Sequence, residues 1–244
     1  MVCATHLFLD FDDTLTPMQE HRQRYIITMA RLLSNRYGGQ VDTWEQAVRS
    51  ALEASIRRYT ERFVGPSTEG FREWLKEEQR RQAWDVCAKA GIPAALEFDL
   101  KEQGIALQHL ALRMCSTPYP GTAEALQAMT GRGMRIHMAS AWDAGYLSAA
   151  LEGMGLAEYV CYRFGPDLVD CAKEGPEFYR RAFHACGIEP EDAIVVDDQP
   201  TCLDWAAAVG AHPVQARFNG QPQMLEAAVE RMDELPGVVA RIGC

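Results

Sequence analysis

Two aspartates separated by one residue, Asp10 and Asp12, follow a short apolar run near the start of the chain. The run, residues 6–9, predicts a buried strand, so both carboxylates emerge where that strand ends and the chain turns. In an open α/β sheet, the carboxyl ends of the strands form the ligand crevice. One carboxylate there could act as a covalent nucleophile and the other as a general acid and base. The alternative is an Asp-rich turn that only satisfies local backbone donors.

Ser140 and Ala141 directly follow a second predicted strand, residues 134–139. A hydroxyl and adjacent backbone amides that open a helix are suited to holding a phosphate oxygen. For Ser140 alone, the simpler interpretation is that it caps the helix predicted at 143–153. Lys173 lies in a loop before another helix, where it could neutralise a phosphoryl group and crowded carboxylates. By itself, a lysine in such a loop is more typical of a solvated side chain.

A pair of adjacent aspartates, Asp197 and Asp198, ends the apolar run at 193–196. Two carboxylates at the end of a buried strand repel each other unless a cation or a donor compensates. If Asp10 and Asp12 converge from a neighbouring strand, all of these carboxylates share one crevice. Mg²⁺ prefers such oxygen ligands, together with water and substrate phosphate. The sequence therefore predicts a Mg²⁺ site.

The elements that must position these residues fall into two regions. Residues 17 to about 118 are predicted to be almost purely helical. The first helix spans 20–37, the second begins at a capping box at Thr43, and the third spans about 68–90 after a turn at Val64-Gly65-Pro66. A fourth runs from Pro93 to about Cys115, and Gly104 weakens its helical pattern. From Pro118 onward, helices at 122–131, 143–153, 175–186, 201–208 and about 222–233 alternate with strands at 134–139, 193–196 and 213–216. This alternation predicts an α/β fold with a doubly wound parallel sheet, interrupted by a helical insertion.

Composition limits the class of partner. The net charge of −10 argues against binding to nucleic acid or to an anionic membrane. No apolar run approaches the roughly 18 residues of a membrane span, and a secretory signal is not expected. The eight cysteines form no C-x-x-C pair, which argues against zinc and favours free thiols in the cytoplasm.

In this order, the motifs resemble those of the haloacid dehalogenase-like (HAD) superfamily of aspartyl-phosphate hydrolases. They are Asp-x-Asp-x-Thr at 10–14, the strand-end Ser140, the loop lysine Lys173 and the acidic pair at 197–198. Similar surroundings accompany them, such as Pro120-Gly121 and the stretches 173–179 and 206–211. The resemblance covers residues 6–16 and about 118–216. It implies a Rossmann-like core domain at 1–16 and 118–244, with a helical C1 cap domain at 17–117.

The resemblance also implies roles for individual residues. Asp10 would be the nucleophile, Asp12 the general acid and base, and Lys173 a bridge between the nucleophile and the phosphoryl group. Ser140 and Ala141 would bind the phosphoryl group. The Mg²⁺ ligands would be Asp10, the backbone carbonyl of Asp12, and Asp198. Asp197 would either bind the ion directly or contact one of its ligands.

Two positions depart from the family pattern. Asp13 stands where many members have glycine, and this adds a charge to the motif. Cys202 stands where a subset of members carries a further aspartate, so the metal has less carboxylate support than in that subset.

The function implied is a cytoplasmic, Mg²⁺-dependent phosphatase that acts on a small phosphorylated metabolite. A phosphomutase keeps both aspartates and stays an alternative, as does a catalytically silent phosphate-binding protein. Dehalogenase and phosphonatase activities are disfavoured because their members lack the acid/base aspartate. The cap would set the substrate, which the sequence does not identify, and its polar and aromatic residues are interpreted as surface or packing residues: His21, Arg22, Arg24, Arg58, Arg62, Trp74 and Trp84.

Overall fold

Six parallel strands form one sheet in the computed structural model, which describes residues 5–63, 69–92 and 94–242. The strand order is β3-β2-β1-β4-β5-β6. The strands are β1 (His6–Leu9), β2 (Arg135–Ala139), β3 (Val160–Phe164), β4 (Ala193–Asp197), β5 (His212–Ala216) and β6 (Ala228–Val229). The winding direction reverses between β1 and β4, and in such folds the ligand crevice lies beyond the carboxyl ends of the strands at that point. The prediction of a doubly wound parallel sheet is confirmed.

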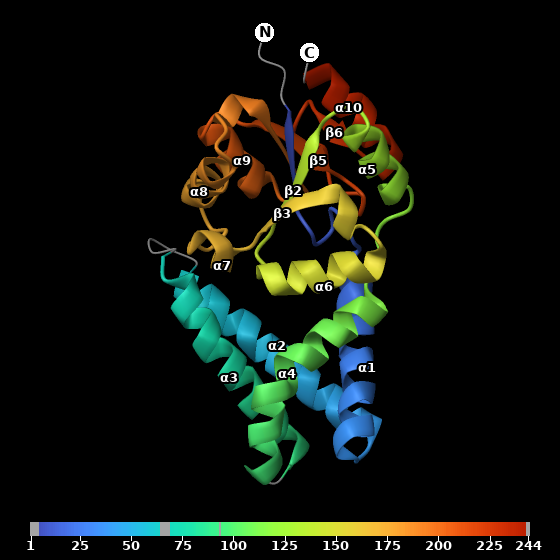
Figure 1. Cartoon of the computed structure of the whole chain (residues 1–244), viewed down its shortest axis with the longest axis vertical. Coiled ribbons are helices and arrows are strands. Elements are labelled where there is room, and N and C mark those ends of the chain that lie inside the picture. The colour runs from blue at the N-terminus through green and yellow to red at the C-terminus, as the bar shows by residue number, and fades with distance from the viewer. Residues whose placement is uncertain (1–4, 64–68, 93, 243–244) are drawn as a thin grey trace.

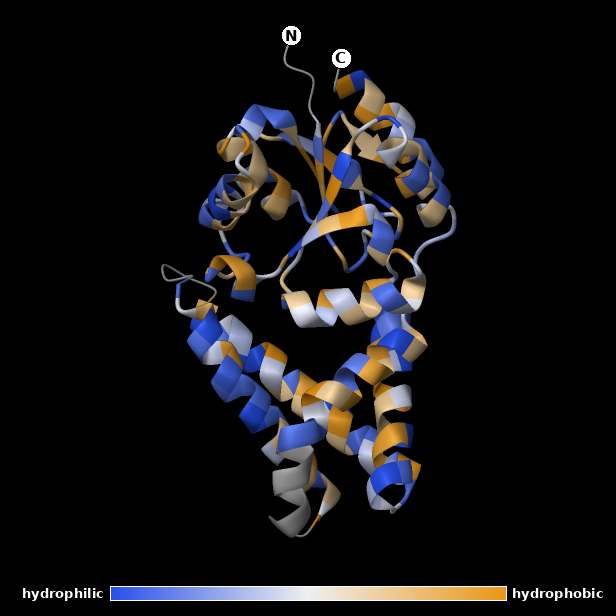
Figure 2. Cartoon of the chain, viewed as in Figure 1, coloured by the Kyte–Doolittle hydropathy of each residue, from blue (hydrophilic) through white to orange (hydrophobic). Residues whose placement is uncertain are grey.

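Helices cover both faces of the sheet, because successive side chains of a strand point to opposite faces. Leu7 and Leu9 pack in one apolar cluster with α5 (Thr122–Thr130), α6 (Ala144–Met154) and α10 (Leu235–Ile242). Phe8 packs in the other cluster with α8 (Pro176–Cys186) and α9 (Pro200–Ala208), while the short α7 (Pro166–Val169) precedes α8. Figure 2 shows hydrophobic residues along the central strands, between these two layers.

Four long helices lie between β1 and α5 in the chain and are called the helical insert. They are α1 (Met18–Tyr37), α2 (Val41–Phe63), α3 (Phe71–Ala90) and α4 (Ala94–Cys115). Figure 1 shows the insert below α6, on the side of the sheet opposite the two termini. The insert has its own apolar core, which includes Ile26, Leu33, Trp44, Val48 and Val86.

The insert also contacts the rest of the chain at a second point, beside α7. Arg72 at the start of α3 donates to the backbone carbonyls of Asp167 and Leu168, at 2.5 and 2.7 Å. Its backbone N–H donates to the Asp170 carboxylate at 3.0 Å. The packing of α4 on α6 provides the other contact, so the insert is held over the ends of the strands from two sides.

Several local expectations were wrong. Helix α2 begins at Val41, so Thr43 lies inside it and does not form a capping box; the Trp44 indole N–H instead donates to the Gly38 carbonyl at 2.8 Å. The helix predicted up to about Cys115 is confirmed, because α4 continues through Gly104 to Cys115. Strand β3 was not predicted, because this edge strand exposes Tyr162 and lacks a continuous apolar run. The turn expected at residues 64–66 and the helix start expected at 93 lie outside the described residues.

The helix predicted at about 222–233 is also wrong, because a buried side chain binds the backbone that the helix would need. The Gln215 side-chain oxygen accepts hydrogen bonds from the N–H groups of Met224 and Leu225, at 2.8 and 3.3 Å. Its amide nitrogen donates to the Pro222 carbonyl at 3.0 Å. The chain then forms β6, the 3₁₀ turn Met232–Glu234 and α10. The other short 3₁₀ turns are Ala157–Tyr159 and Pro190–Asp192.

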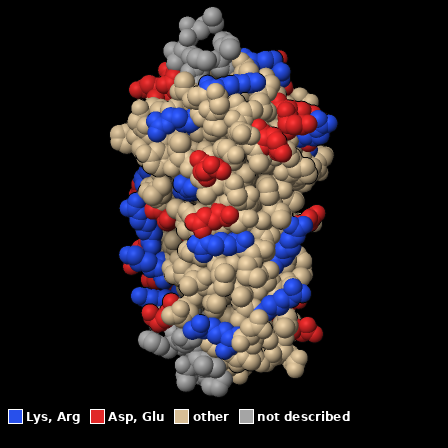
Figure 3. All heavy atoms as spheres, turned by 45° about the vertical axis from the view of Figure 1, so that its right-hand side comes forward, with Lys and Arg blue, Asp and Glu red and all other residues tan. Residues whose placement is uncertain are grey.

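Surface features bear on the expected partners. Among the described residues, no helix is both long enough and apolar enough to span a membrane. On the face shown in Figure 3, basic and acidic side chains are interspersed. The thiols of Cys115, Cys161, Cys186 and Cys202 are free, whereas Cys3 and Cys244 lie outside the described residues.

Candidate active site

Asp10 and Asp12 occupy the loop that leaves the end of β1. The Asp10 backbone N–H donates to the Val196 carbonyl of β4 at 3.0 Å, which extends the β1–β4 pairing by one residue. The N–H groups of Leu15 and Thr16 both donate to the Phe11 carbonyl, and these bonds close the turn. Asp10 is buried, with only 7% of the residue exposed.

Lys173, in the loop between α7 and α8, joins the ends of β1 and β4. Its buried ammonium group donates to Asp10 Oδ1 at 2.6 Å and to Asp197 Oδ2 at 2.7 Å. Burial would lower the pKa of Lys173, but the two carboxylates outweigh that effect and raise the pKa well above its usual value. Lys173 is therefore a fixed positive charge at the expected crevice.

Of the two adjacent aspartates at the end of β4, one is buried and the other is half-buried. Asp197 is buried, and its Oδ1 accepts a hydrogen bond from the Gln199 N–H at 2.9 Å. Asp198 is less buried, and burial together with the neighbouring Asp197 raises its pKa to about 7. One oxygen from each of Asp10, Asp197 and Asp198 lies within 4.8 Å of the other two.

This donor set fits Mg²⁺, which binds carboxylate oxygens in proteins. Burial raises the pKa of Asp10 well above its usual value even though Lys173 opposes the shift, and Asp197 and Asp12 raise it further. When carboxylates are crowded and buried, their charged forms are unfavourable, and a bound divalent cation stabilises those charged forms. Asp10, Asp197 and Asp198 are the residues that could hold it.

Asp12 lies in a different environment from Asp10. Burial raises its pKa to about 6, although the Trp142 indole N–H opposes the shift by donating to Asp12 Oδ2 at 2.8 Å. Trp142 itself stacks on Tyr146 of α6, with ring centroids 4.3 Å apart. A carboxyl group with a pKa near neutrality can exchange a proton in either direction, as general acid–base catalysis requires.

Trp142 was missed by the sequence reasoning. The available signal was its position, because it follows Ser140 and Ala141 in a loop that was already expected to face the site.

The interpretation that Ser140 caps the next helix is wrong. Asp143 is the N-cap of α6, and its Oδ1 accepts a hydrogen bond from the Tyr146 N–H at 3.0 Å. The Ser140 hydroxyl oxygen accepts only a long bond from the Trp142 N–H, at 3.4 Å. The hydroxyl hydrogen of Ser140 is thus available to donate to a ligand, and the adjacent Ala141 lines a cavity shared with Asp12.

The structure accounts for the aspartate that replaces glycine in the family pattern. Asp13 has a φ of 53°, in the left-handed region that favours glycine but that aspartate also tolerates. Its Oδ1 accepts a hydrogen bond from the Met18 N–H at 2.9 Å, at the start of α1. Cys202, the second departure, is buried, and burial raises the pKa of its thiol. It therefore adds no negative charge to the site at neutral pH.

The polar and aromatic residues of the helical insert separate into two groups. His21, Arg22 and Trp74 line the cavity below Asp12. His21 also makes a 2.8 Å hydrogen bond with the Tyr146 hydroxyl, and burial lowers its pKa to about 4. The second group does not line the cavity and consists of Arg24, Arg58, Arg62 and Trp84.

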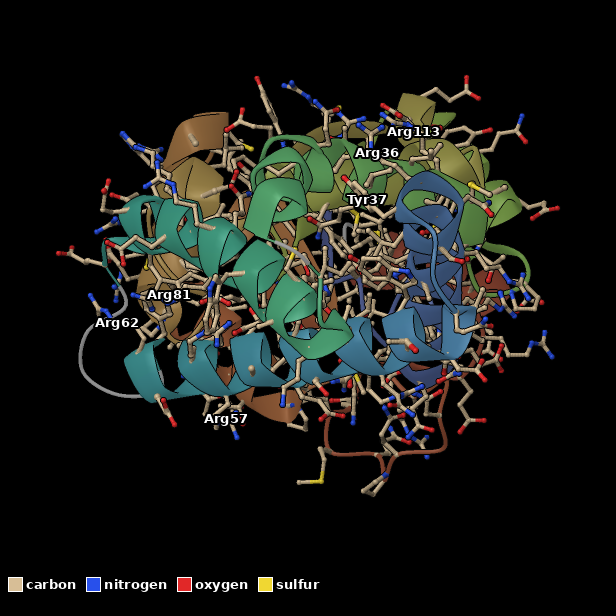
Figure 4. The ribbon with its side chains drawn as sticks, turned by 90° about the horizontal axis from the view of Figure 1, so that it is seen from below. Arg36, Tyr37, Arg57, Arg62, Arg81 and Arg113 are labelled. Carbon is tan, nitrogen blue, oxygen red and sulfur yellow. The ribbon has the colours of Figure 1, made fainter. Side chains whose placement is uncertain are left out.

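The members of this second group pair with other residues or lie at the surface. Arg24 pairs with Glu20 at 3.0 Å, and Trp84 is 57% exposed. Figure 4 shows Arg57 and Arg62 at the outer edge of the insert. The interpretation as surface or packing residues therefore holds for these positions.

Comparison with known proteins assigns the family. A model of the haloacid dehalogenase-like hydrolases matches residues 5–212. The chain belongs to this family. The match takes in both β1 and β4 and the whole helical insert of this haloacid dehalogenase-like hydrolase.

Two curated proteins are similar to part of the haloacid dehalogenase-like hydrolase. The phosphoglycolate phosphatase of Rhodospirillum rubrum is 34% identical over 101 residues, which are 41% of this chain and 42% of that protein. The chloroplast flavin mononucleotide hydrolase 1 of Arabidopsis thaliana is 29% identical over 90 residues, which are 37% of this chain and 36% of that protein. The matches thus span less than half the length of each relative.

Solved structures share the fold of this haloacid dehalogenase-like hydrolase over nearly its whole length. A 2-haloacid dehalogenase from Pseudomonas syringae has a TM-score of 0.70 at 16% identity and covers 99% of both chains. A putative HAD hydrolase from Bacillus subtilis, bound to magnesium, has a TM-score of 0.65 at 12% identity and covers 97% of this chain and 99% of its own. At these identities the likeness concerns the fold alone.

Proposed function

We propose that this chain is a Mg²⁺-dependent phosphatase that hydrolyses a small phosphomonoester through an aspartyl phosphate on Asp10. The observation that carries the proposal is the position of Asp12. It lines the cavity below the site, where a leaving group would lie, and its pKa is about 6. A dehalogenase needs no proton donor for a leaving halide, whereas a phosphomonoester leaves an alcohol oxygen that must be protonated.

The chemistry uses the side chains in sequence. The Asp10 carboxylate attacks phosphorus in line and forms an acyl phosphate, while Asp12 gives its proton to the departing alcohol oxygen. Asp12 then takes a proton from the water that hydrolyses the acyl phosphate, which regenerates both carboxyl groups. Lys173 offsets the negative charge of the phosphoryl group, and Ser140 and Ala141 hold its oxygens.

Asp10, Asp197 and Asp198, with the backbone carbonyl of Asp12, would hold Mg²⁺. The close approach of the oxygens of the three carboxylates supports this assignment, as do the raised pKa values of Asp10 and Asp198. The cation supplies positive charge that reduces the repulsion between the carboxylates and an anionic phosphoryl group.

The helical insert would act as the cap of the family. On this proposal the core domain comprises 1–16 and 118–244 and the cap domain 17–117. The cap separates the acyl phosphate from bulk water, which favours small substrates over phosphoproteins. A cytoplasmic location stays a prediction.

The proposal is tested with an aryl phosphate and Mg²⁺. The wild-type chain should release phosphate, and thorough chelation should abolish that activity until Mg²⁺ is returned. Asp10→Asn should be inactive and remain unphosphorylated. Asp12→Asn should still be phosphorylated at Asp10, because an aryl leaving group needs little protonation, and intact-mass spectrometry should detect the accumulated phosphoprotein.

Two results would contradict the mechanism. Phosphorylation of the Asp10→Asn variant would show that the nucleophile is misassigned, and undiminished turnover by Asp12→Asn would remove Asp12 from its role. A phosphomutase would instead return the phosphoryl group to a sugar phosphate rather than release inorganic phosphate.

A further inference from the structure

A cavity of about 330 Å³ opens from the candidate active site into the helical insert. Its wall includes Asp12, Ala141 and Trp142 on the core side and residues of all four insert helices on the other. Figure 1 shows the insert helices below α6. Because Asp12 lines the cavity, an alcohol group that departs next to Asp12 would extend into it.

Apolar and aromatic side chains form most of the lining. Those from α1, α2 and α3 include Tyr25, Met29, Leu52, Trp74, Leu75 and Val86. A cavity of this size and lining is typical of sites that bind small apolar molecules.

The charged groups of the lining do not alter this character. Glu78 is 1% exposed, and the Arg58 guanidinium neutralises it through bonds of 2.6 and 2.8 Å to its two carboxylate oxygens. Arg58 also donates to Asp85 at 3.0 Å. Among the described lining residues, Arg22 is the only Lys or Arg, and it lies near enough to Asp12 to lower its pKa. The deeper wall therefore offers no cation to an anionic group.

We propose that this cavity binds the alcohol part of the substrate, which is a phosphomonoester carrying a bulky apolar group, either an aromatic ring or an alkyl chain. The proposal rests on the proposed phosphatase function and specifies its substrate class. A short carboxylate such as glycolate would fill little of the cavity. If its carboxylate lay among the apolar side chains of the lining, the loss of hydration of that charge would be unfavourable. An apolar group gains by leaving water.

The test is a series of phosphomonoesters assayed with Mg²⁺. From ethyl through butyl and hexyl to octyl phosphate, kcat/KM should rise up to about fourfold per methylene until the cavity is full. 1-Naphthyl phosphate should exceed phenyl phosphate, and phosphoglycolate should be the poorest substrate. A flat or falling series, or a preference for phosphoglycolate, would overturn the assignment.

Two matched variants on α4 test the cavity wall. Ile105 lines the cavity and is 39% exposed, whereas Leu110 does not line it and is 42% exposed. Ile105→Gln should lower kcat/KM for octyl phosphate by roughly threefold to tenfold, and it should lower kcat/KM for ethyl phosphate by less, because the ethyl group fills less of the cavity. Leu110→Gln should change neither value. An unaltered Ile105→Gln variant, or equal losses in both variants, would contradict the proposal.

Binding measurements separate this inference from the phosphatase proposal. If no ester is hydrolysed, the phosphatase proposal fails, but the cavity can still be tested by calorimetry with octylphosphonate and methylphosphonate. Tighter binding of octylphosphonate, weakened in Ile105→Gln and kept in Leu110→Gln, would support an apolar ligand site. Equal binding of the two phosphonates would overturn it.

Discussion

Lys173 divides the carboxylates of the site into two groups. Asp10 and Asp197 accept hydrogen bonds from its ammonium group, at 2.6 and 2.7 Å. The other two, Asp12 and Asp198, have pKa values raised to about 6 and about 7 by burial. The first two are bound into an ion-pair network, while the second two can gain or lose a proton, or be stabilised by a cation, near neutral pH.

This difference predicts that two conservative substitutions change different properties, the stability of the fold in one case and the binding of Mg²⁺ in the other. Asp197→Asn breaks a buried contact with Lys173 and should lower the free energy of unfolding by about 3 kcal/mol or more. Asp198→Asn removes a charge whose burial is unfavourable and should leave stability nearly unchanged while weakening Mg²⁺ binding. Denaturant unfolding without metal and calorimetric titration of Mg²⁺ measure the two effects. The assignment fails if Asp198→Asn is the more destabilising of the two.

At the scale of the elements, the contact between α4 and α6 sets how the helical insert joins the core. Gly153 of α6 faces the backbone of α4, and a Cβ atom there would lie 2.5 Å from the Arg113 carbonyl oxygen. A backbone atom cannot move aside as a flexible side chain can, so only glycine allows this approach. By contrast, a Cβ atom at Gly104 of α4 would have no heavy atom of the described residues within 4 Å.

These two helical glycines form a matched pair. Gly153→Ala should destabilise the chain by about 1–3 kcal/mol, because α4 must move away from α6. Gly104→Ala should stabilise it by about 0.5–1 kcal/mol through higher helix propensity. Thermal and denaturant unfolding of both variants provide the measurement. Stabilisation by Gly153→Ala would show that the two helices do not pack this closely.

At the scale of the whole molecule, buried histidines connect stability to pH. His137 in β2 is buried and lies 3.0 Å from His6 of β1, between Nε2 and Nδ1. Burial lowers the pKa of His137 to about 3, and His6 and Arg135 lower it further; the Cys186 thiol also lies nearby. The unfolded chain therefore binds more protons than the folded chain between about pH 6.5 and pH 3.

Stability should consequently fall as pH falls below about 6.5, with a slope of up to about 1.4 kcal/mol per pH unit from His137. His137→Gln cannot take up this proton and should reduce that slope. The remaining slope should include His6 and His21, whose pKa values burial also lowers. His184→Gln, at an exposed position, is the control and should leave the slope unchanged. Equal slopes for His137→Gln and the wild type, from denaturant unfolding at several pH values, would refute this account.

The sequence by itself determined the positions of the site residues along the chain and the class of fold. The apolar runs before Asp10, Ser140 and Asp197 predict strand ends, because short apolar runs of this kind are typical of buried strands and a change to polar residues marks their end. Parallel strands bring their carboxyl ends to one edge of the sheet. These are short-range patterns, and the order of the motifs adds the family resemblance.

Tertiary structure alone decided which side chains meet and what surrounds them. Trp142 donates to Asp12 across 130 positions of the chain, and Gln215 prevents a helix that the local residues favour. The cavity below Asp12 forms only when four helices pack together. Contacts of this kind depend on distances between segments far apart in sequence, and local periodicity carries no information about those distances.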